Sequence, residues 1–267
     1  MTVTIIGAGG RMGRMLVKAV AEEPLARLVG ATARPGADGL GQDAGVLAGI
    51  KPLGVYLTSD PAVAIAKSDI VIDFTTPEAT VETARLCAQA HAVHVVGTTG
   101  LGSEHVEALE KAARHTQVVY APNMSVGVNL LIGLTRKVAA LLGPDYDIEI
   151  VEMHHRHKVD APSGTALGLG RAAAAGRGVD HDEAAILSRE GMTGPRPEGA
   201  IGYATLRGGE VVGEHTVVFA GPAERIELTH KASDRALFAT GAVRAGLWAR
   251  ERPAGLYSMA DVLGLSE

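Results

Sequence analysis

The sequence predicts an α/β protein with an N-terminal Rossmann-like domain, built on a doubly wound parallel sheet, and a C-terminal α+β domain with a mixed or antiparallel sheet. Three observations support this fold class. Short apolar runs alternate with helical stretches through the first half of the chain, as they do in parallel sheets. A glycine-rich turn at residues 7–13 joins the first apolar run to the first helical stretch. In the second half, three apolar runs follow one another without an intervening helix, which is typical of an antiparallel or mixed sheet.

Composition and charge exclude several classes of protein. With 46% hydrophobic and 21% charged residues among 267, the chain has the composition of a folded globular protein. A formal net charge of −5 without blocks of like charge argues against nucleic-acid binding. Cys87 is the only cysteine, so we expect no intramolecular disulfide and no thiolate metal site, and we place it in the core. There is no signal-peptide pattern and no apolar run of membrane-spanning length, so we expect a cytoplasmic protein without membrane contact.

The first element is a strand over residues 3–6, followed by the glycine turn and a helix over residues 14–22. Glycines between a strand and a helix let a pyrophosphate approach the helix N-terminus, which is typical of dinucleotide binding. Met12 occupies the place of the third glycine in the common G-x-G-x-x-G pattern, so the spacing here is that of Gly7, Gly10 and Gly13. An ordinary strand–helix turn is the alternative, but the position at the start of the chain favours the nucleotide.

The second strand, residues 28–32, bears on which cofactor is bound. A ribose-binding acid is expected near its end, about 20 residues after the glycines. The sequence has no acid there before Asp38 and offers Arg34 instead. An arginine at this place can contact a 2′-phosphate, which favours NADP(H); the alternative is a solvated loop arginine. A glycine-rich surface loop with a short helical turn is expected over residues 36–54.

Three further strands, residues 68–74, 93–96 and 117–120, end in small and polar residues. Helices are expected after each, from about 75–78 to 90, from a cap at Ser103 to about 115, and from 126 to 142. In a doubly wound sheet the carboxyl ends of the strands line the ligand crevice. Turn chemistry alone would also explain the polar residues, but three such ends beside the glycine turn predict a wall for the nicotinamide.

After residue 126 the organisation changes. A helix over 164–177 is followed by a polar loop, by strands over 201–207, 211–220 and 225–232, and by a helix over 235–250. We expect that last helix to rejoin the first domain. The predicted domains are therefore residues 1–125 with 236–267 for the dinucleotide, and 126–235 for substrate binding and oligomerisation. The second sheet is small, so an open apolar face is expected to form a subunit contact.

The stretch 149–166 concentrates the titratable groups, with five basic residues in a row at 154–158. If the strand stays extended through Lys158, alternation places His154, Arg156 and Lys158 on one face and His155 and His157 on the other. Just beyond, Ser163 is the expected N-cap of a helix whose free N–H groups form an anion site. Cations beside a helix N-terminus predict a small substrate with several negative charges.

The motifs GAGGRMG, GTTG, APNMS and EMHHRHKVDAPSGTA, with GEHTVVFAG and ELTHKASDR, resemble those of the bacterial 4-hydroxy-tetrahydrodipicolinate (dihydrodipicolinate) reductases over essentially the whole chain. The resemblance implies an oxidoreductase of diaminopimelate–lysine biosynthesis. Such an enzyme transfers a hydride from NADH or NADPH to a cyclic dicarboxylate, and water is lost to give tetrahydrodipicolinate. The resemblance also implies a homotetramer formed through the second sheet.

Carried over by position, the resemblance implies that His154 is the proton donor and acceptor and that Lys158 is a proton donor. It implies that His155, Gly164 and Thr165 contact the substrate carboxylates. The implied cofactor contacts are Gly7, Ala8, Gly9, Gly10, Arg11, Met12, Arg34, Gly97, Thr98, Thr99, Ala121, Pro122, Asn123 and Met124. Many members carry an acid before the arginine, where this chain has Ala33, so we expect NADPH to be used at least as well as NADH.

The sequence leaves three alternatives open. The three histidines of residues 154–157 could hold a metal, but we expect none because strand alternation separates them and no thiolate is available. A non-catalytic dinucleotide-binding regulator would leave the histidine–lysine cluster unexplained. A dehydrogenase of another aspartate-family intermediate could share the two-domain plan. His215 and His230 are expected to serve packing or subunit contact.

Overall fold

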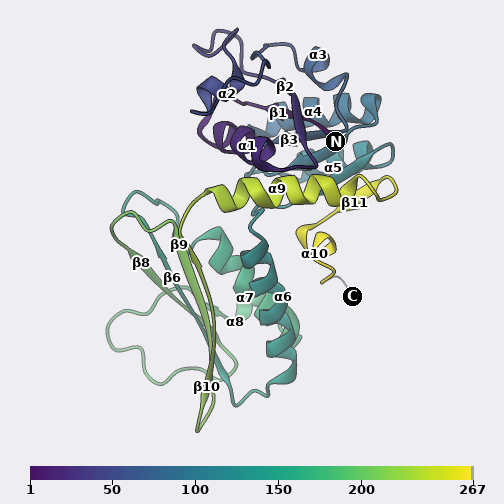
Figure 1. Ribbon diagram of the computed structural model, residues 1–267. Coiled ribbons are helices and arrows are strands. Elements are labelled where there is room, and N and C mark those ends of the chain that lie inside the picture. The colour runs from purple at the N-terminus through teal and green to yellow at the C-terminus, as the bar shows by residue number, and fades with distance from the viewer. Residues whose placement is uncertain (266–267) are drawn as a thin grey trace. The chain divides into compact units, whose positions relative to one another are not determined.

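The computed structural model describes residues 1–265, which form two compact units. The first unit is Met1–Val126 together with the chain from Ala236 onward, and the second is Gly127–Arg235 (Figure 1). These limits differ from the boundaries we expected only in the assignment of Val126. None of the described helices is long and apolar enough to cross a membrane.

The first unit contains a six-stranded sheet in which every pairing is parallel, in the order β11-β5-β4-β3-β1-β2. Its strands are β1 (Thr2–Ile6), β2 (Arg27–Ala31), β3 (Ile70–Asp73), β4 (Val93–Val96), β5 (Gln117–Tyr120) and β11 (Gly255–Tyr257). This arrangement confirms the predicted Rossmann-like sheet. The edge strand β11 was not predicted, since three residues carry too little alternation to be recognised.

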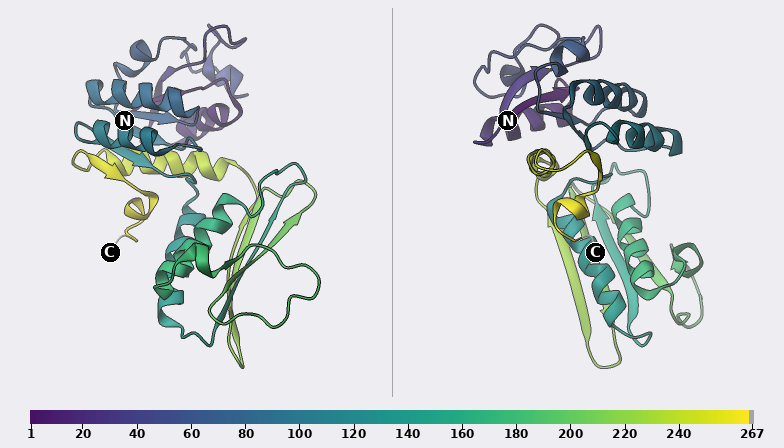
Figure 2. Two further views of the ribbon diagram at one scale, coloured as in Figure 1. Left: turned by 180° about the vertical axis from the view of Figure 1, so that it is seen from behind. Right: turned by 90° about the vertical axis from the view of Figure 1, so that its right-hand side faces the viewer.

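Helices cover both faces of this sheet (Figure 2). Helices α1 (Arg11–Glu22) and α9 (Ala236–Ala249) bury their apolar sides against Ile5 and Ile72. On the other face lie α4 (Pro77–Ala90) and α5 (Ser103–Ala113), and Cys87 is fully buried there, as expected. The short helices of the unit are α2 (Ala44–Leu47), α3 (Pro61–Ile65) and α10 (Met259–Val262). The return of α9 to this unit makes the unit discontinuous in sequence.

The second unit has a five-stranded mixed sheet in the order β10-β9-β6-β8-β7. Its strands are β6 (Asp147–His154), β7 (Ala185–Ile186), β8 (Ile201–Arg207), β9 (Gly213–Ala220) and β10 (Arg225–Ala232). The central strand β6 runs antiparallel to β9 and parallel to β8, which confirms the mixed sheet. The helices that accompany it are α6 (Val126–Leu141), α7 (Gly164–Arg177) and α8 (His181–Ala184).

Within residues 1–265, helices cover one face of this sheet and not the other (Figure 2). Ile148 and Ile150 of β6 are fully buried in a core with residues of α6 and α7. Because side chains alternate along a strand, Glu152 and His154 lie on the same face. The opposite face is partly exposed and chemically mixed. It carries Leu206 of β8, which is 50% exposed, and Glu214 of β9, and both residues pair with Met153 of the strand between them.

The structure corrects three local predictions. Strand β6 ends at His154 rather than continuing through Lys158, because the backbone turns there and the N–H of Lys158 donates to the carbonyl of His155 at 3.1 Å. Ser103 is the first residue of α5 and not its cap; the cap is Gly102, whose N–H donates to His105 Nδ1. The first helix begins at residue 11, inside the glycine-rich segment 7–13, and not at residue 14 as expected, so its first N–H groups lie within the motif itself.

Candidate active site

The candidate catalytic site is built around the start of α7. Ser163 is the N-cap, and its buried Oγ accepts the N–H of Ala166 at 3.1 Å, as expected. Gly164 and Thr165 form the first turn, and the space beside Gly164 is open. Free N–H groups at such a helix start attract anions because the helix dipole is positive there. The predicted helix start, capped by Ser163, is therefore observed, and its binding of a carboxylate stays a prediction.

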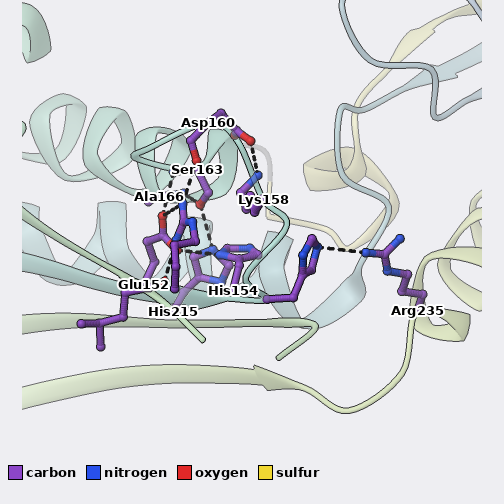
Figure 3. A network of polar contacts seen from close by, with 11 residues as sticks. Glu152, His154, Lys158, Asp160, Ser163, Ala166, His215 and Arg235 are labelled. Carbon is purple, nitrogen blue, oxygen red and sulfur yellow. Dashed lines mark hydrogen bonds and ion pairs between the residues drawn. The ribbon is translucent and has the colours of Figure 1, made fainter. Parts of the chain in front are cut away.

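Strand β6 brings two ionisable side chains to this helix start from its helix-covered face (Figure 3). One is Glu152, which is 1% exposed, and the other is His154, which is 9% exposed. The Nδ1 of His154 lies 2.6 Å from Oε2 of Glu152. The Oε1 of Glu152 accepts the N–H of Ser163 at 3.0 Å, so the same carboxylate reaches both the imidazole and the helix cap.

Arg207 of β8 completes the contacts of Glu152. Its Nη1 and Nη2 donate to the two carboxylate oxygens at 2.8 and 2.9 Å, and Nη2 also donates to the carbonyl of Asp160 at 2.7 Å. Burial alone would raise the pKa of Glu152, but the hydrogen bonds from Arg207, His154 and Ser163 outweigh burial and hold that pKa below its ordinary value. Glu152 is therefore ionised at neutral pH.

The two histidines of the site are neutral at neutral pH. Burial lowers the pKa of His154; Glu152 opposes this shift, while Lys158 and Arg207 add to it. His215 of β9 meets His154 edge to face, with 5.0 Å between ring centroids, and its Nε2 lies 3.1 Å from Ser163 Oγ. Burial, with the neighbouring His154, lowers the pKa of His215 to about 4. His215 thus contacts the site, beyond the packing role that the sequence suggested.

The turn after β6 carries the remaining basic residues. The Nζ of Lys158 donates to Oδ1 of Asp160 at 2.6 Å, and Lys158 lies near enough to His154 to affect its pKa. His155 Nε2 accepts from Arg235 Nη2 at 3.2 Å. Arg156 and His157 are exposed. Among residues 1–265, no three histidine, cysteine or carboxylate side chains are arranged to hold a metal ion.

The glycine turn of the first unit fits a dinucleotide. Gly7 has φ +72°, in the left-handed region that favours glycine. A Cβ at Gly13 would overlap the carbonyl oxygen of Gly7 and lie 2.6 Å from Cα of Ala8, so only glycine allows α1 to start this close to β1. Gly10 is the N-cap and supplies no side-chain oxygen, which leaves the first N–H groups of α1 to a ligand. Ala8, Gly9, Arg11 and Met12 complete this segment.

The carboxyl ends of β3 and β4 are tied together by hydroxyl groups. Asp73 is fully buried, and its Oδ1 accepts the N–H and Oγ1–H of Thr75 at 2.9 and 2.6 Å. Thr98 Oγ1 accepts the N–H of Thr75 at 3.1 Å. Beside it, Gly97 packs against the ring of Phe74. Thr99 is exposed at the end of this segment.

The end of β5 and the loop after β2 hold the other expected cofactor residues. Ala121 and Met124 are buried, Pro122 is exposed, and Asn123 Oδ1 accepts the N–H of Ser125 at 2.9 Å. In the loop after β2, Arg34 is exposed. The first acid there, Asp38, is also exposed, and the next, Asp43, has its carboxylate engaged by the N–H groups of Gly45, Val46, Leu53 and Gly54.

Three residues of the candidate site, Glu152, Arg207 and Arg235, were not identified from the sequence. Of these residues, only Glu152 could have been recognised from the sequence. Glu152 falls on the apolar phase of β6, and a carboxylate at a buried strand position needs a partner. Arg207 and Arg235 are far from the motif in sequence. The register of β6 with β8 places Arg207 opposite His154, and the fold of the second unit brings Arg235 to His155.

Comparisons with known proteins agree over the whole chain. Residues 1–124 match the model of the N-terminal domain of dihydrodipicolinate reductase, and residues 127–263 match that of its C-terminal domain. A 4-hydroxy-tetrahydrodipicolinate reductase of Methylocella silvestris is 58% identical over 100% of this chain and 98% of that protein. One of Brucella abortus is 55% identical over the full length of both chains. A solved structure of a dipicolinate-bound dihydrodipicolinate reductase from Paenisporosarcina has a TM-score of 0.79 at 25% identity, covering 98% of each chain.

Proposed function

The chain belongs to the dihydrodipicolinate reductase family, and we propose that it reduces 4-hydroxy-tetrahydrodipicolinate to tetrahydrodipicolinate with a nicotinamide cofactor. One observation supports this most directly. His154, Lys158 and the N-terminus of α7 lie together (Figure 3), so side chains that can transfer protons are close to a helix start that can bind a carboxylate. A cyclic dicarboxylate fits that combination.

The first unit is proposed to hold the cofactor. Its left-handed Gly7, the close approach at Gly13 and the uncapped start of α1 form a cradle that fits a pyrophosphate. The wall of Gly97, Thr98 and Thr99 is proposed to flank the nicotinamide. When bound, the cofactor supplies the hydride. NADPH is proposed to serve at least as well as NADH, since Arg34 follows β2 and the residue immediately before it is Ala33 and not an acid.

The second unit is proposed to bind the dicarboxylate and supply the proton. The N–H groups of Gly164 and Thr165, with His155, would contact a carboxylate, and Arg235 already donates to His155. Reduction adds a hydride and a proton to the ring, and water leaves. Lys158 is the proposed proton donor, and His154, neutral at pH 7, is the proposed acceptor and donor that relays it.

The test is to supply the product of dihydrodipicolinate synthase and to follow NADPH oxidation. Oxidation that depends on the synthase is expected, and its absence would refute the proposal. His154→Ala and Lys158→Ala are each expected to lower kcat by about 100-fold or more while the Kd for NADPH stays within about twofold. His157→Ala, which removes an exposed histidine of the same turn, is the matched control and should retain kcat.

Two rival functions give different results in the same assay. A dinucleotide-binding regulator would bind NADPH without oxidising it, and a dehydrogenase of another aspartate-family intermediate would turn over only with that intermediate. A metal-dependent enzyme would lose activity after treatment with a chelator, which we do not expect.

We also propose a cytoplasmic homotetramer assembled through the sheet of the second unit. Light scattering of the purified protein would test the oligomeric state.

A further inference from the structure

The buried carboxylate of Glu152 has four donors around two oxygens. Oε1 accepts from the Ser163 N–H and from Arg207 Nη2, while Oε2 meets His154 Nδ1 and accepts from Arg207 Nη1. An ionised carboxylate offers enough lone pairs for all four, whereas a protonated one would have to give up at least one of them. The guanidinium of Arg207 donates to both carboxylate oxygens and therefore favours the ionised form of Glu152.

An ionised Glu152 decides where the proton of His154 resides. A carboxylate can only accept, and the 2.6 Å contact therefore requires a proton on Nδ1. In the neutral ring the other nitrogen, Nε2, then carries the lone pair. Within the part of the chain that the structure describes, Nε2 has no hydrogen-bond partner, so it remains available to a substrate. The ring also passes close to Gly213, where a Cβ would stand 3.1 Å from Nε2.

The same carboxylate also fixes the anion-binding helix. Its Oε1 receives the N–H of Ser163, the residue that caps α7. Ser163 Oγ in turn lies 3.1 Å from His215, whose ring packs edge-on against His154. The carboxylate of Glu152 therefore holds both the His154 imidazole and the first turn of α7, and neither can shift without breaking a hydrogen bond to it.

We propose that Glu152 is a positioning residue of the reduction, which holds the His154 proton on Nδ1, presents Nε2 to the substrate and sets the first turn of α7 against that ring. Arg207 serves this role indirectly, by keeping Glu152 charged and by donating to the Asp160 carbonyl in the loop that carries Lys158. The inference rests on the proposed role of His154 and extends it to a residue whose carboxylate is occupied by Arg207, His154 and Ser163.

Glu152→Gln is the primary test, since an amide has one acceptor oxygen for donors that now use two. The ring of His154 should then lose its single tautomer. In ¹⁵N-histidine spectra of the wild type, Nδ1 of His154 is expected to carry the proton and Nε2 to be bare at pH 8. In Glu152→Gln a mixture of both tautomers is expected. The kcat should fall by about 10- to 100-fold, with the Kd for NADPH within about twofold of wild type.

The pH profile supplies a second readout. His154 is faced by the negative charge of Glu152, by the cations Lys158 and Arg207, and by neutral His215. Removing the negative charge leaves the two cations to oppose protonation of the ring. The limb of the kcat profile that reports His154 should therefore move to lower pH by about one unit in Glu152→Gln.

The matched control is Glu149→Gln, on the same strand but the opposite face. Glu149 also binds arginines, with Arg189 at 2.7 and 2.9 Å and Arg196 at 2.9 Å, so the control removes a comparable ion pair. It is expected to leave the His154 tautomer and the pH limb unchanged. Glu152→Asp, which keeps the charge but withdraws it by one methylene, is the second variant and should also give mixed tautomers and reduced kcat.

The outcomes separate this inference from the proposed function. An unchanged His154 tautomer and an unchanged pH limb in Glu152→Gln would overturn the inference. If kcat nevertheless fell in that variant, Glu152 would have a structural role alone. If Glu152→Gln does not fold, a wild-type tautomer and kcat in Glu152→Asp would overturn it instead. Full activity of His154→Ala would refute the proposed role of His154, whatever the tautomer shows.

Discussion

Ser163 should be among the most sensitive positions of the second unit, because its hydroxyl serves two buried groups at once. Its Oγ accepts the N–H of Ala166 at 3.1 Å and lies 3.1 Å from Nε2 of His215, and the side chain is 2% exposed. Ser163→Ala removes both contacts but keeps the backbone N–H that donates to Glu152. The substitution therefore tests the hydroxyl and not the path of the chain.

The expected cost follows from those two contacts. Loss of an N-cap side chain costs about 0.5–2 kcal/mol, and a buried imidazole nitrogen left without a partner costs about 1–3 kcal/mol. Ser163→Ala should thus lower the free energy of unfolding by about 1.5 to 5 kcal/mol in urea denaturation. A looser first turn of α7 should also raise the KM for the dicarboxylate by about 3- to 10-fold, while the Kd for NADPH stays unchanged.

Ser258→Ala is the matched control. Ser258 caps α10 in the first unit, where its Oγ accepts the N–H of Asp261 at 3.3 Å, without a buried histidine beside it. It should lose about 1 kcal/mol, with no change in KM. If Ser163→Ala were no more destabilising than this control, and KM were unchanged, the hydroxyl would not support His215 or the helix start, and the reasoning would fail.

Three further results are expected. Gly13→Ala should raise the Kd for NADPH by about 10-fold or more, since its methyl would overlap the backbone of the glycine turn, and titration by fluorescence would measure this. The ratio of kcat/KM for NADPH to that for NADH should be at least one and should fall about 10-fold in Arg34→Ala, whereas a strong NADH preference in the wild type would contradict it. His215 has a pKa of about 4 when folded and an ordinary value of 6.5, so the unfolded chain binds more protons between these values. Stability should therefore fall by up to about 3 kcal/mol as pH drops from 6.5 to 4, and urea denaturation of His215→Gln should lack that part of the slope.

Much of the fold follows from local sequence. The alternation of Ile148 and Ile150, the glycines of residues 7–13 and the cap at Ser163 each act within a few residues, so strands, turns and helix starts could be predicted with nearly their observed limits. The parallel character of the first sheet followed from the alternation of strands and helices. Where prediction failed, as in the extension of β6 through Lys158, a backbone turn interrupted the alternation.

The chemistry of the site required tertiary structure. The sequence identified His154 and Lys158, but it did not show that Glu152 meets Arg207, 55 residues away, or that His215 meets Ser163, 52 residues away. Those contacts depend on the register of β6 with β8 and β9, in which a shift of one residue would turn each side chain to the other face. Local periodicity determines which residues can face the core, but only the pairing of distant strands decides which buried charges and imidazoles come into contact.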